Sequence, residues 1–343
     1  MSYFSIIVPV YNMAGRMDAC FRSLASQTFA DFEVLFVDDG STDDSLRDIR
    51  EYCRQDSRFR FITYPKNRSI LIARYTGMRQ VNGSYILFVD SDDTLSPRAL
   101  ELLYQRLRSA PVDILRFGHE EVYHDNTVSG KTIPEKNRTI MPLHTDNPLL
   151  SMLSDQMAPN IFKNCYARGV VERAILRAEQ FYCNMGEDVY WSTVLFSCAQ
   201  SDGILEECLY HYNIGGGIST APTNRTLQQL TSYIGHLRVC MDHVRTYLAT
   251  YHPELLPLTD GKFLRMNCFL MLTFVIDETD YSKVIDYLKA FDTEELRTVY
   301  LHGCNKVLPF KFRRQNRITD EMLDRLGFSH DRLTVNYLED LRL

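Results

Sequence analysis

Short apolar runs alternate with amphipathic stretches through the first 110 residues of the chain. Four of these runs end in polar residues and have the length and composition of buried β-strands. They are Phe4–Val10, Phe32–Val37, Phe59–Tyr64 and Tyr85–Val89. Between them, apolar residues recur at spacings of three and four, which predicts helices. This alternation favours an α/β fold with a mostly parallel sheet that is flanked by helices on both faces.

Residue types at the helix ends add detail to this pattern. Ser41 or Thr42 is placed as the N-cap of the helix after the second strand. The segment 70–81 reads as the next helix, with Gly83 just beyond its end. Ser96–Pro97 offers an N-cap and a proline at the first helical position, so we expect the following helix to begin there.

The second half of the chain divides into three stretches. Residues 124–160 hold several Pro, Asn, Thr and His residues, which predicts a long loop or insertion. Strand and helix signals return over 161–212, and only helical patterns follow from about 225. We therefore expect an α/β domain over 1–222 and a helical C-terminal region over 223–343.

Composition narrows the class of protein. The chain has 343 residues, 45% of them hydrophobic, which is typical of a globular protein. Its 38 basic and 44 acidic residues give a net charge of -6, which argues against a dedicated nucleic-acid binder. The nine cysteines include no C-x-x-C pair, so we expect a reduced compartment and no disulfide framework or zinc ribbon. We also expect no signal peptide and no transmembrane helix, and hence a cytoplasmic location.

Acidic side chains follow two of the predicted strands directly. Asp38 and Asp39 come after Val37, and Asp90-Ser91-Asp92-Asp93 comes after Val89. Ligands of such sheets bind beyond the carboxyl ends of the strands. Asp38 or Asp39 can accept hydrogen bonds from a base or a ribose. Carboxylates crowded together at 90–93 are easier to hold with a bound cation, and Mg²⁺ or Mn²⁺ takes oxygen ligands that it shares with phosphates. The alternative for both clusters is an ordinary capped polar turn.

Further candidates lie elsewhere along the chain. Tyr11 could stack on a planar ring, and Asn12 could hydrogen-bond to it, although both also fit a plain strand exit. Arg74 is a permanent cation that suits a diphosphate or a base carbonyl, or is simply solvated. Glu187 and Asp188 precede a helix, where acids either complement the helix dipole or act as a general base.

In this order, the motifs resemble the family 2 glycosyltransferases of the GT-A fold. The residues that carry the resemblance are Ser5–Asn12, Ser23 with Gln27-Thr28-Phe29, Phe32–Asp43, Asn67 with Ala73-Arg74, Gly77 and Gly83, Tyr85–Asp93, and Gly186-Glu187-Asp188. The clear match covers about residues 3–110, and a looser one extends to about 220. The resemblance implies a Rossmann-like nucleotide-diphospho-sugar transferase with a nucleotide-sugar half over about 1–110 and an acceptor half over about 111–222.

The resemblance also implies a donor site. The residues that it assigns to the nucleotide and the donor sugar are Pro9, Tyr11, Asn12, Asp38, Asp39, Arg74, Asp90 and Ser91. Within this set, Asp39 faces the base and Asp90 approaches the ribose or the sugar. Two departures from the family pattern lie nearby, namely Tyr75 in place of an asparagine and Arg68-Ser69-Ile70 in place of a glycine-rich loop.

The same resemblance assigns the chemistry. Asp92 binds Mn²⁺ or Mg²⁺, with His211 as a less secure second ligand. Asp188 is the catalytic base and Glu187 its neighbour. The implied reaction is an inverting transfer from a UDP-sugar to a glycan or lipid-linked glycan in bacterial surface polysaccharide synthesis. The competing readings are a nucleotide-sugar-binding assembly subunit without turnover and a nucleotidyltransferase, although no glycine-rich, lysine-bearing triphosphate loop is present.

A basic segment stands out near the C-terminus. Residues 306–317 include five Lys or Arg side chains among apolar ones, and no acid occurs between 305 and 319. We expect a peripheral contact with anionic lipid at the inner face of the membrane, or else a solvated basic loop. The sequence shows no heptad or seam that predicts a dimer, so it leaves the oligomeric state open.

Overall fold

The computed structural model describes residues 2–123, 128–132, 148–154, 157–214 and 226–263, together with 266 and 270. The chain forms two compact units, Met1–Ala221 with Gly235–Lys262, and Pro222–Ile234 with Phe263–Leu343. The first unit contains the sheet and every site residue discussed below. The expected division at 222/223 stays a prediction, and the basic segment 306–317 lies outside the described residues.

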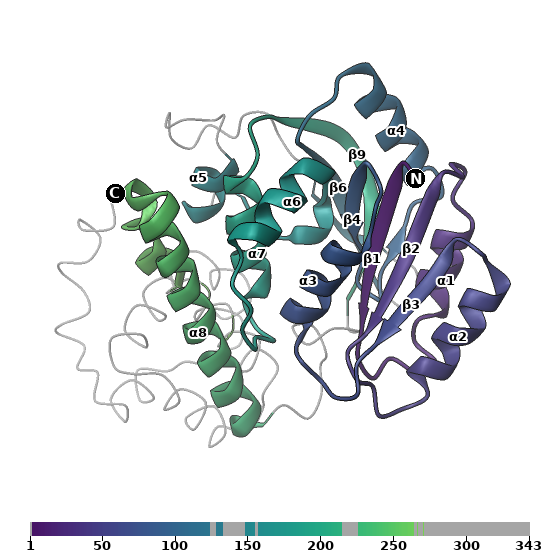
Figure 1. Ribbon diagram of the computed structural model, residues 1–343, viewed down its shortest axis with the longest axis horizontal. Coiled ribbons are helices and arrows are strands. Elements are labelled where there is room, and N and C mark those ends of the chain that lie inside the picture. The colour runs from purple at the N-terminus through teal and green to yellow at the C-terminus, as the bar shows by residue number, and fades with distance from the viewer. Residues whose placement is uncertain are drawn as a thin grey trace. The chain divides into compact units, whose positions relative to one another are not determined.

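The N-terminal half of the sheet is parallel. Strand β1 (Phe4–Val10) pairs with β2 (Phe32–Asp38) on one side and with β4 (Tyr85–Phe88) on the other, and β3 (Phe59–Thr63) pairs with β2 (Figure 1). All seven residues of β1 are buried. Burial on both faces explains why this strand is a continuous apolar run instead of an alternating one.

Helices cover both faces of these strands. Helices α1 (Asp18–Ala25) and α2 (Ser45–Gln55) lie on one face and α3 (Ile70–Gln80) on the other (Figure 1). Helix α3 approaches β1 closely at Gly77, where an added Cβ would lie 2.3 Å from Cγ2 of Ile7. The missing side chain therefore sets the distance of this helix from the sheet.

The second half of the sheet is mixed. The strand order is β3-β2-β1-β4-β8-β6-β9-β5, with β7 (Val128–Thr132) at the side of β6. The added strands are β5 (Thr94–Leu95), β6 (Ile114–Val122), β8 (Asn164–Ala167) and β9 (Asp202–Asn213). Strand β8 runs antiparallel to β4 and β6, whereas β6 and β9 are parallel. The expectation of a mostly parallel sheet thus holds only for the N-terminal half, because a buried apolar run reads alike in either direction.

The remaining helices follow the second half of the sheet. They are α4 (Ala99–Ser109), α5 (Pro148–Leu153), η1 (Ile161–Lys163), α6 (Arg168–Arg177), α7 (Glu187–Ser197), α8 (Leu227–Tyr251) and η2 (Pro253–Leu255). Among the helices whose residues are described, none combines the length and the apolar character that a transmembrane span requires. Strand β7 and helix α5 lie within 124–160, so of the two alternatives for this stretch, a long loop was wrong for those two segments and an insertion stays a prediction.

Two predicted helix starts were also wrong. Helix α2 begins at Ser45 instead of just after Ser41 or Thr42, and α4 begins at Ala99 instead of at Pro97. The hydroxyl of Ser41 accepts a hydrogen bond from the Asn12 backbone N–H at 3.0 Å. It therefore binds the loop after β1 instead of capping a helix, and a local capping pattern cannot reveal such a distant partner.

Candidate active site

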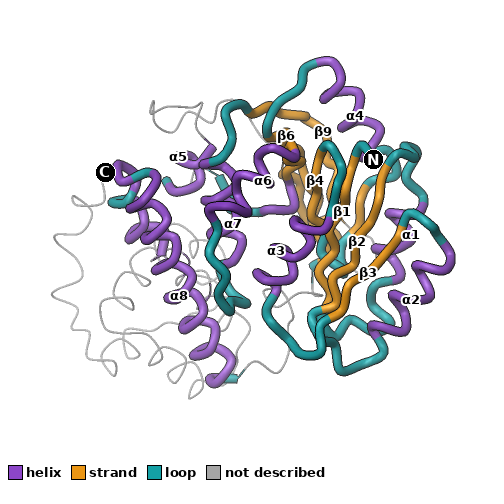
Figure 2. Tube along the Cα trace, in the orientation of Figure 1, coloured by secondary structure: helices purple, strands orange, loops and turns teal. Residues whose placement is uncertain are grey.

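Strands β1, β2 and β4 run parallel and end at one edge of the sheet, where their loops gather (Figure 2). The segment after β1 holds Tyr11 and Asn12, β2 leads into Asp38 and Asp39, and β4 leads into Asp90. The structure thus brings three of the predicted motifs to the same edge, as expected for parallel strands.

The two acids at the end of β2, Asp38 within the strand and Asp39 after it, have different surroundings. Asp38 is 1% exposed, and its oxygens accept hydrogen bonds from the Thr63 hydroxyl at 2.7 Å and the Ser41 backbone N–H at 3.2 Å. Asp39 accepts the backbone N–H groups of Arg68 and Ser69, both at 2.8 Å. Burial raises the pKa of Asp39, and these two N–H groups oppose that rise. Both carboxylates therefore order loops, and each oxygen retains a second lone pair for a ligand.

The residues at the end of β1 also divide in role. Pro9 is buried within β1, opposite Val37 of β2. The Tyr11 side chain is 45% exposed at the strand exit, so its ring is accessible. Asn12 adopts a φ of 52°, and its side-chain oxygen accepts the backbone N–H of Thr42 at 2.8 Å. Asn12 thus joins the loops after β1 and β2.

A buried arginine connects the two halves of the unit. Arg74 on α3 is 1% exposed, and its Nη1 lies 2.5 Å from Oδ1 of Asp188 and 3.1 Å from Oε1 of Glu187. Its Nη2 lies 2.9 Å from Oδ1 of Asp90. Its Nε has no hydrogen-bond partner in the described part of the chain. The sequence placed Arg74 near a base or a diphosphate, whereas in the structure its terminal nitrogens bind three carboxylates.

The surroundings of Asp188 set its proton affinity. The pKa of Asp188 is raised to about 7, mainly by burial. The charges of Glu187 and Asp90 contribute to the rise, and the charge of Arg74 opposes it. Burial also raises the pKa of Glu187. Both acids lie in the first turn of α7, where the helix dipole favours negative charge. A carboxylate whose pKa is close to neutral is well matched to general-base work.

The turn after β4 separates a structural acid from an available one. Asp93 is 1% exposed and accepts the Tyr210 hydroxyl at 2.6 Å and the Asn213 backbone N–H at 2.7 Å. The Asp92 carboxylate accepts no hydrogen bond from another residue in the described part of the chain. Burial raises the pKa of Asp92 to about 6, and the charge of Asp90 adds to this effect. Ser91 is buried within the turn.

These residues fit a divalent cation of the kind that the sequence predicted. The described residues hold no group of three or more His, Cys, Asp or Glu side chains arranged for a metal. Mg²⁺ is commonly bound through one or two carboxylates together with substrate phosphates, so a full protein cage is not required. A crowded, half-buried carboxylate at Asp92 has the chemistry of such a ligand.

His211 lies beside this turn through strand pairing. It stands opposite Thr94 in the β5–β9 pair, and its Nδ1 is 3.4 Å from the Thr94 hydroxyl oxygen. Its Nε2 lies 3.9 Å from Oε2 of Glu120. The role of His211 as a second metal ligand stays a prediction.

Sequence reasoning missed two residues that bear on the site. Lys163 at the end of η1 has its pKa lowered to about 8 by burial, while the charges of Asp188 and Glu121 oppose that fall. Tyr210 accepts the backbone N–H of Asp90 at 3.1 Å in addition to donating to Asp93. The sequence signal for Lys163 was a lysine directly after the apolar residues Ile161 and Phe162. No sequence signal pointed to the contacts of Tyr210.

Comparison with known protein families adds a sequence-wide observation. Residues 5–166 match the family model described as glycosyl transferase family 2. Residues 5–166 therefore form a glycosyltransferase family 2 domain. This match includes Asp39, Arg74, Asp90 and Asp92 and ends before Asp188.

A curated relative agrees with this match, and two solved structures share the fold. An uncharacterized glycosyltransferase, EpsJ of Bacillus subtilis (strain 168), is 30% identical over 208 residues, which are 61% of this chain and 60% of EpsJ. The crystal structure of S. aureus TarS 1-349 in complex with UDP-GlcNAc is similar with a TM-score of 0.57 at 17% identity, covering 96% of this chain and 93% of that one. The mannosyltransferase PcManGT from Pyrobaculum calidifontis, in complex with GDP-Man and Mn²⁺, has a TM-score of 0.52 at 15% identity, covering 96% and 88%.

These findings confirm the predicted family 2 glycosyltransferase domain and the GT-A fold. The family 2 domain departs from the expected pattern at two residues near Arg74. The ring centres of Tyr75 and Trp191 lie 6.2 Å apart in a stacked arrangement. Ser69 adopts a φ of 91°. Tyr75 therefore packs α3 against α7, and Ser69 takes a backbone conformation that favours glycine.

Proposed function

We propose that this chain transfers a sugar from a nucleoside-diphosphate sugar, with uridine as the nucleoside, to a hydroxyl of a glycan or lipid-linked glycan. The transfer inverts the configuration at the anomeric carbon. The observation that carries the proposal is the Arg74 network, in which one cation bridges Asp90 on the donor side and Asp188 on the acceptor side. We further propose that the reaction belongs to bacterial surface polysaccharide synthesis, on the cytoplasmic side of the membrane.

The donor site in this proposal lies at the ends of β1 and β2. The exposed Tyr11 ring stacks on the base, and Asp39 accepts a hydrogen bond from it. Asp38 and Asn12 hold the surrounding loops in place. The TarS structure, which shares the fold, was solved with UDP-GlcNAc, and PcManGT was solved with GDP-Man. Both support a nucleotide-sugar donor.

The leaving group is handled at the turn after β4. Asp92 would hold Mn²⁺ or Mg²⁺, a Lewis acid that offsets charge on the departing diphosphate. PcManGT was solved with Mn²⁺, which supports this choice. Tyr210 and Asn213 fix Asp93 and hence the turn, so the Asp92 carboxylate is presented without rearrangement. Preorganised charge of this kind is usually the largest contribution to such catalysis.

The acceptor is activated at the start of α7. Asp188 takes the proton of the acceptor hydroxyl while that oxygen forms a bond to the anomeric carbon. The bond from this carbon to the diphosphate oxygen breaks on the opposite face, and UDP leaves with the bonding electrons. Arg74 keeps Asp188 ionised before the transfer, and Glu187 shares the same guanidinium.

The alternative of a binding subunit without turnover makes a different prediction. The test is UDP release from a panel of UDP-sugars by wild type, Asp188→Asn and the control Asp242→Asn, an exposed acid on α8. We expect Asp188→Asn to lower release by about 10²- to 10⁴-fold, the usual contribution of a general base. Equal release by Asp188→Asn and wild type would contradict this role. UDP binding without release from any donor, with or without candidate acceptors, would favour the binding subunit.

The proposed membrane contact through residues 306–317 needs a separate test. Co-sedimentation with anionic liposomes should fall when Lys311, Arg313 and Arg314 are all changed to Glu. Equal binding by wild type and this triple variant would rule out the contact.

A further inference from the structure

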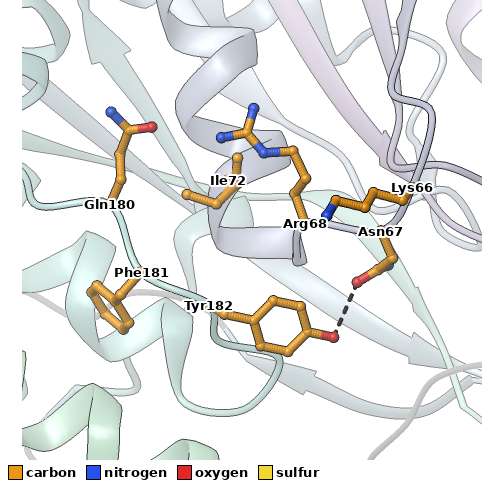
Figure 3. A pocket seen from close by; sticks show the side chains of 7 residues that line it. All are labelled: Lys66, Asn67, Arg68, Ile72, Gln180, Phe181 and Tyr182. Atoms are coloured by element: carbon orange, nitrogen blue, oxygen red, sulfur yellow. Dashed lines mark hydrogen bonds between the residues drawn. The ribbon is translucent and has the colours of Figure 1, made fainter.

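A cavity of about 330 Å³ lies beside the start of α3. Residues 66–68 and Ile72 line one side of it, and residues 180–182 line the other (Figure 3). We call this the lateral pocket. None of the eight residues assigned above to the nucleotide and the donor sugar lines this cavity, although the backbone N–H of Arg68 binds Asp39.

The lateral pocket carries two positive charges, one of which, that of Arg68, also lowers the pKa of Asp39. Lys66 and Arg68 are both exposed, and neither forms an ion pair with any described residue. The Arg68 guanidinium lies 4.8 Å from the centre of the Tyr64 ring, which holds it in place. In a chain with a net charge of -6, two unpaired cations at one pocket favour an anionic ligand.

The opposite wall has the features of a saccharide site. Tyr182 is 50% exposed and presents its ring to the cavity, while its hydroxyl donates to the Asn67 side chain at 3.1 Å (Figure 3). The Phe181 ring is stacked on the His243 ring with 3.8 Å between the ring centres, and this contact holds the Phe181 side chain in place. Aromatic faces pack against the apolar C–H faces of sugar rings, and the amides of Asn67 and Gln180 suit sugar hydroxyls.

Hydrogen bonds connect this wall to the start of α3 and to the segment before α7. The Asn184 side chain donates to the Tyr182 hydroxyl at 3.0 Å and accepts the Ile70 backbone N–H at 3.2 Å. Ile70 begins α3, which carries Arg74 one turn later, and Asn184 lies four residues before Asp188. A ligand in the lateral pocket would therefore be held by the same segments that position Asp188.

We propose that the lateral pocket is an acceptor subsite for a saccharide unit that carries a carboxylate or a phosphate. This inference rests on the proposed function and adds the charge class of its acceptor. Lys66 and Arg68 bind the anionic group, and Tyr182 packs against the sugar ring. The reacting hydroxyl belongs to a neighbouring unit of the same acceptor.

The test compares matched charged and neutral sugars at low ionic strength. Binding of methyl β-glucuronide, methyl β-glucoside, glucose 6-phosphate and inorganic phosphate is measured by NMR on the full chain with UDP and Mn²⁺. The variants are the double Lys66→Gln/Arg68→Gln, Tyr182→Ala and the control Arg54→Gln, which removes an exposed cation from α2. UDP binding is measured for each protein to report the donor site separately.

We expect at least one anionic sugar to bind about fivefold more tightly than the glucoside, the effect of a charge contact near the surface. The double variant should lose this preference, and Arg54→Gln should keep it. Tyr182→Ala should weaken the binding of every sugar. A preference for the glucuronide alone would identify a carboxylate, and one for glucose 6-phosphate alone a phosphate.

Three results would overturn the inference. The first is equal binding of charged and neutral sugars, and the second is a preference for charged sugars that survives in the double variant. The third is an affinity for inorganic phosphate that equals the affinity for glucose 6-phosphate. Each leaves the proposed function intact if wild type still binds UDP. If the wild-type protein did not bind UDP, the result would instead count against the proposed function.

Discussion

Nη1 of Arg74 lies 2.5 Å from Oδ1 of Asp188, although 114 residues separate the two along the chain. Arg74 comes from a helix packed on the parallel half of the sheet, and Asp188 comes from the first turn of α7. The guanidinium is 1% exposed and the Asp188 side chain 29% exposed, so the arginine side of this ion pair is shielded from solvent. The charge state of the proposed base is thus set by a residue from the other half of the unit.

The first prediction concerns the pH dependence of UDP release in Arg74→Gln. A general base acts when deprotonated, so release should rise with pH through the Asp188 pKa of about 7 and then level off. Arg74 lowers that pKa, so its loss should raise it and move the rise about 1–3 pH units higher. Arg74→Lys keeps the charge and should move the profile less. An unchanged profile in folded Arg74→Gln would contradict the assignment.

The second prediction has the opposite sign and uses Glu187→Gln. The Glu187 charge raises the pKa of Asp188, so removing it should lower that pKa and move the rise to lower pH. The measurement is the same pH profile of UDP release, with thermal unfolding to show that the variant is folded. If the pH profile of Glu187→Gln moved in the same direction as that of Arg74→Gln, the profile would report a general disturbance of the structure and not the local charge at Asp188.

The third prediction concerns the backbone at Ser69. This residue has φ 91° and ψ 153°, a region that is nearly restricted to glycine and that costs other residues about 1–3 kcal/mol. Its hydroxyl is buried without a hydrogen-bond partner among the described residues, so Ser69→Gly and Ser69→Ala remove the same group. At ordinary positions Gly is less stable than Ala by about 0.5–1 kcal/mol. Here Ser69→Gly should be the more stable in urea unfolding, and the reverse order would show that the strain is absent.

The fourth prediction compares two glycines in helices. Gly77→Ala places a Cβ 2.3 Å from Ile7, so we expect a loss of about 1–3 kcal/mol in unfolding free energy. Gly235 lies on α8, and an added Cβ there meets no atom within 4 Å. Gly235→Ala should therefore raise the unfolding free energy by up to about 1 kcal/mol through helix propensity. Equal effects in urea unfolding would contradict the close approach of α3 to β1.

Much of the parallel half could be predicted from the sequence. The run Phe4–Val10 is strand β1 without a change of bounds, and the acids after Val37 and Val89 do follow strand ends. Apolar runs and the acids that end them are local signals, because burial on both faces of a sheet demands the first and a ligand-binding edge favours the second.

The rest depended on contacts between distant segments. No local pattern distinguishes Asp38 from Asp39, because only the fold brings Thr63 to the first and the Arg68 and Ser69 backbone to the second. The partners of Arg74 come from positions 16, 113 and 114 residues away. The direction of β8 was equally hidden, since its four residues pair with strands that are remote in the sequence.

The most direct test of the central claim is a calorimetric titration with UDP, with and without Mn²⁺. Wild type, Asp92→Ala and the control Asp242→Ala are compared at pH 7.5, above the Asp92 pKa of about 6, so that this carboxylate is ionised. We predict that tight UDP binding requires both Mn²⁺ and Asp92 and is unchanged in Asp242→Ala, because Asp92 would hold the cation that neutralises the diphosphate charge. UDP binding that is absent from wild type, or that is independent of both Mn²⁺ and Asp92, would contradict a metal-assisted UDP-sugar transferase.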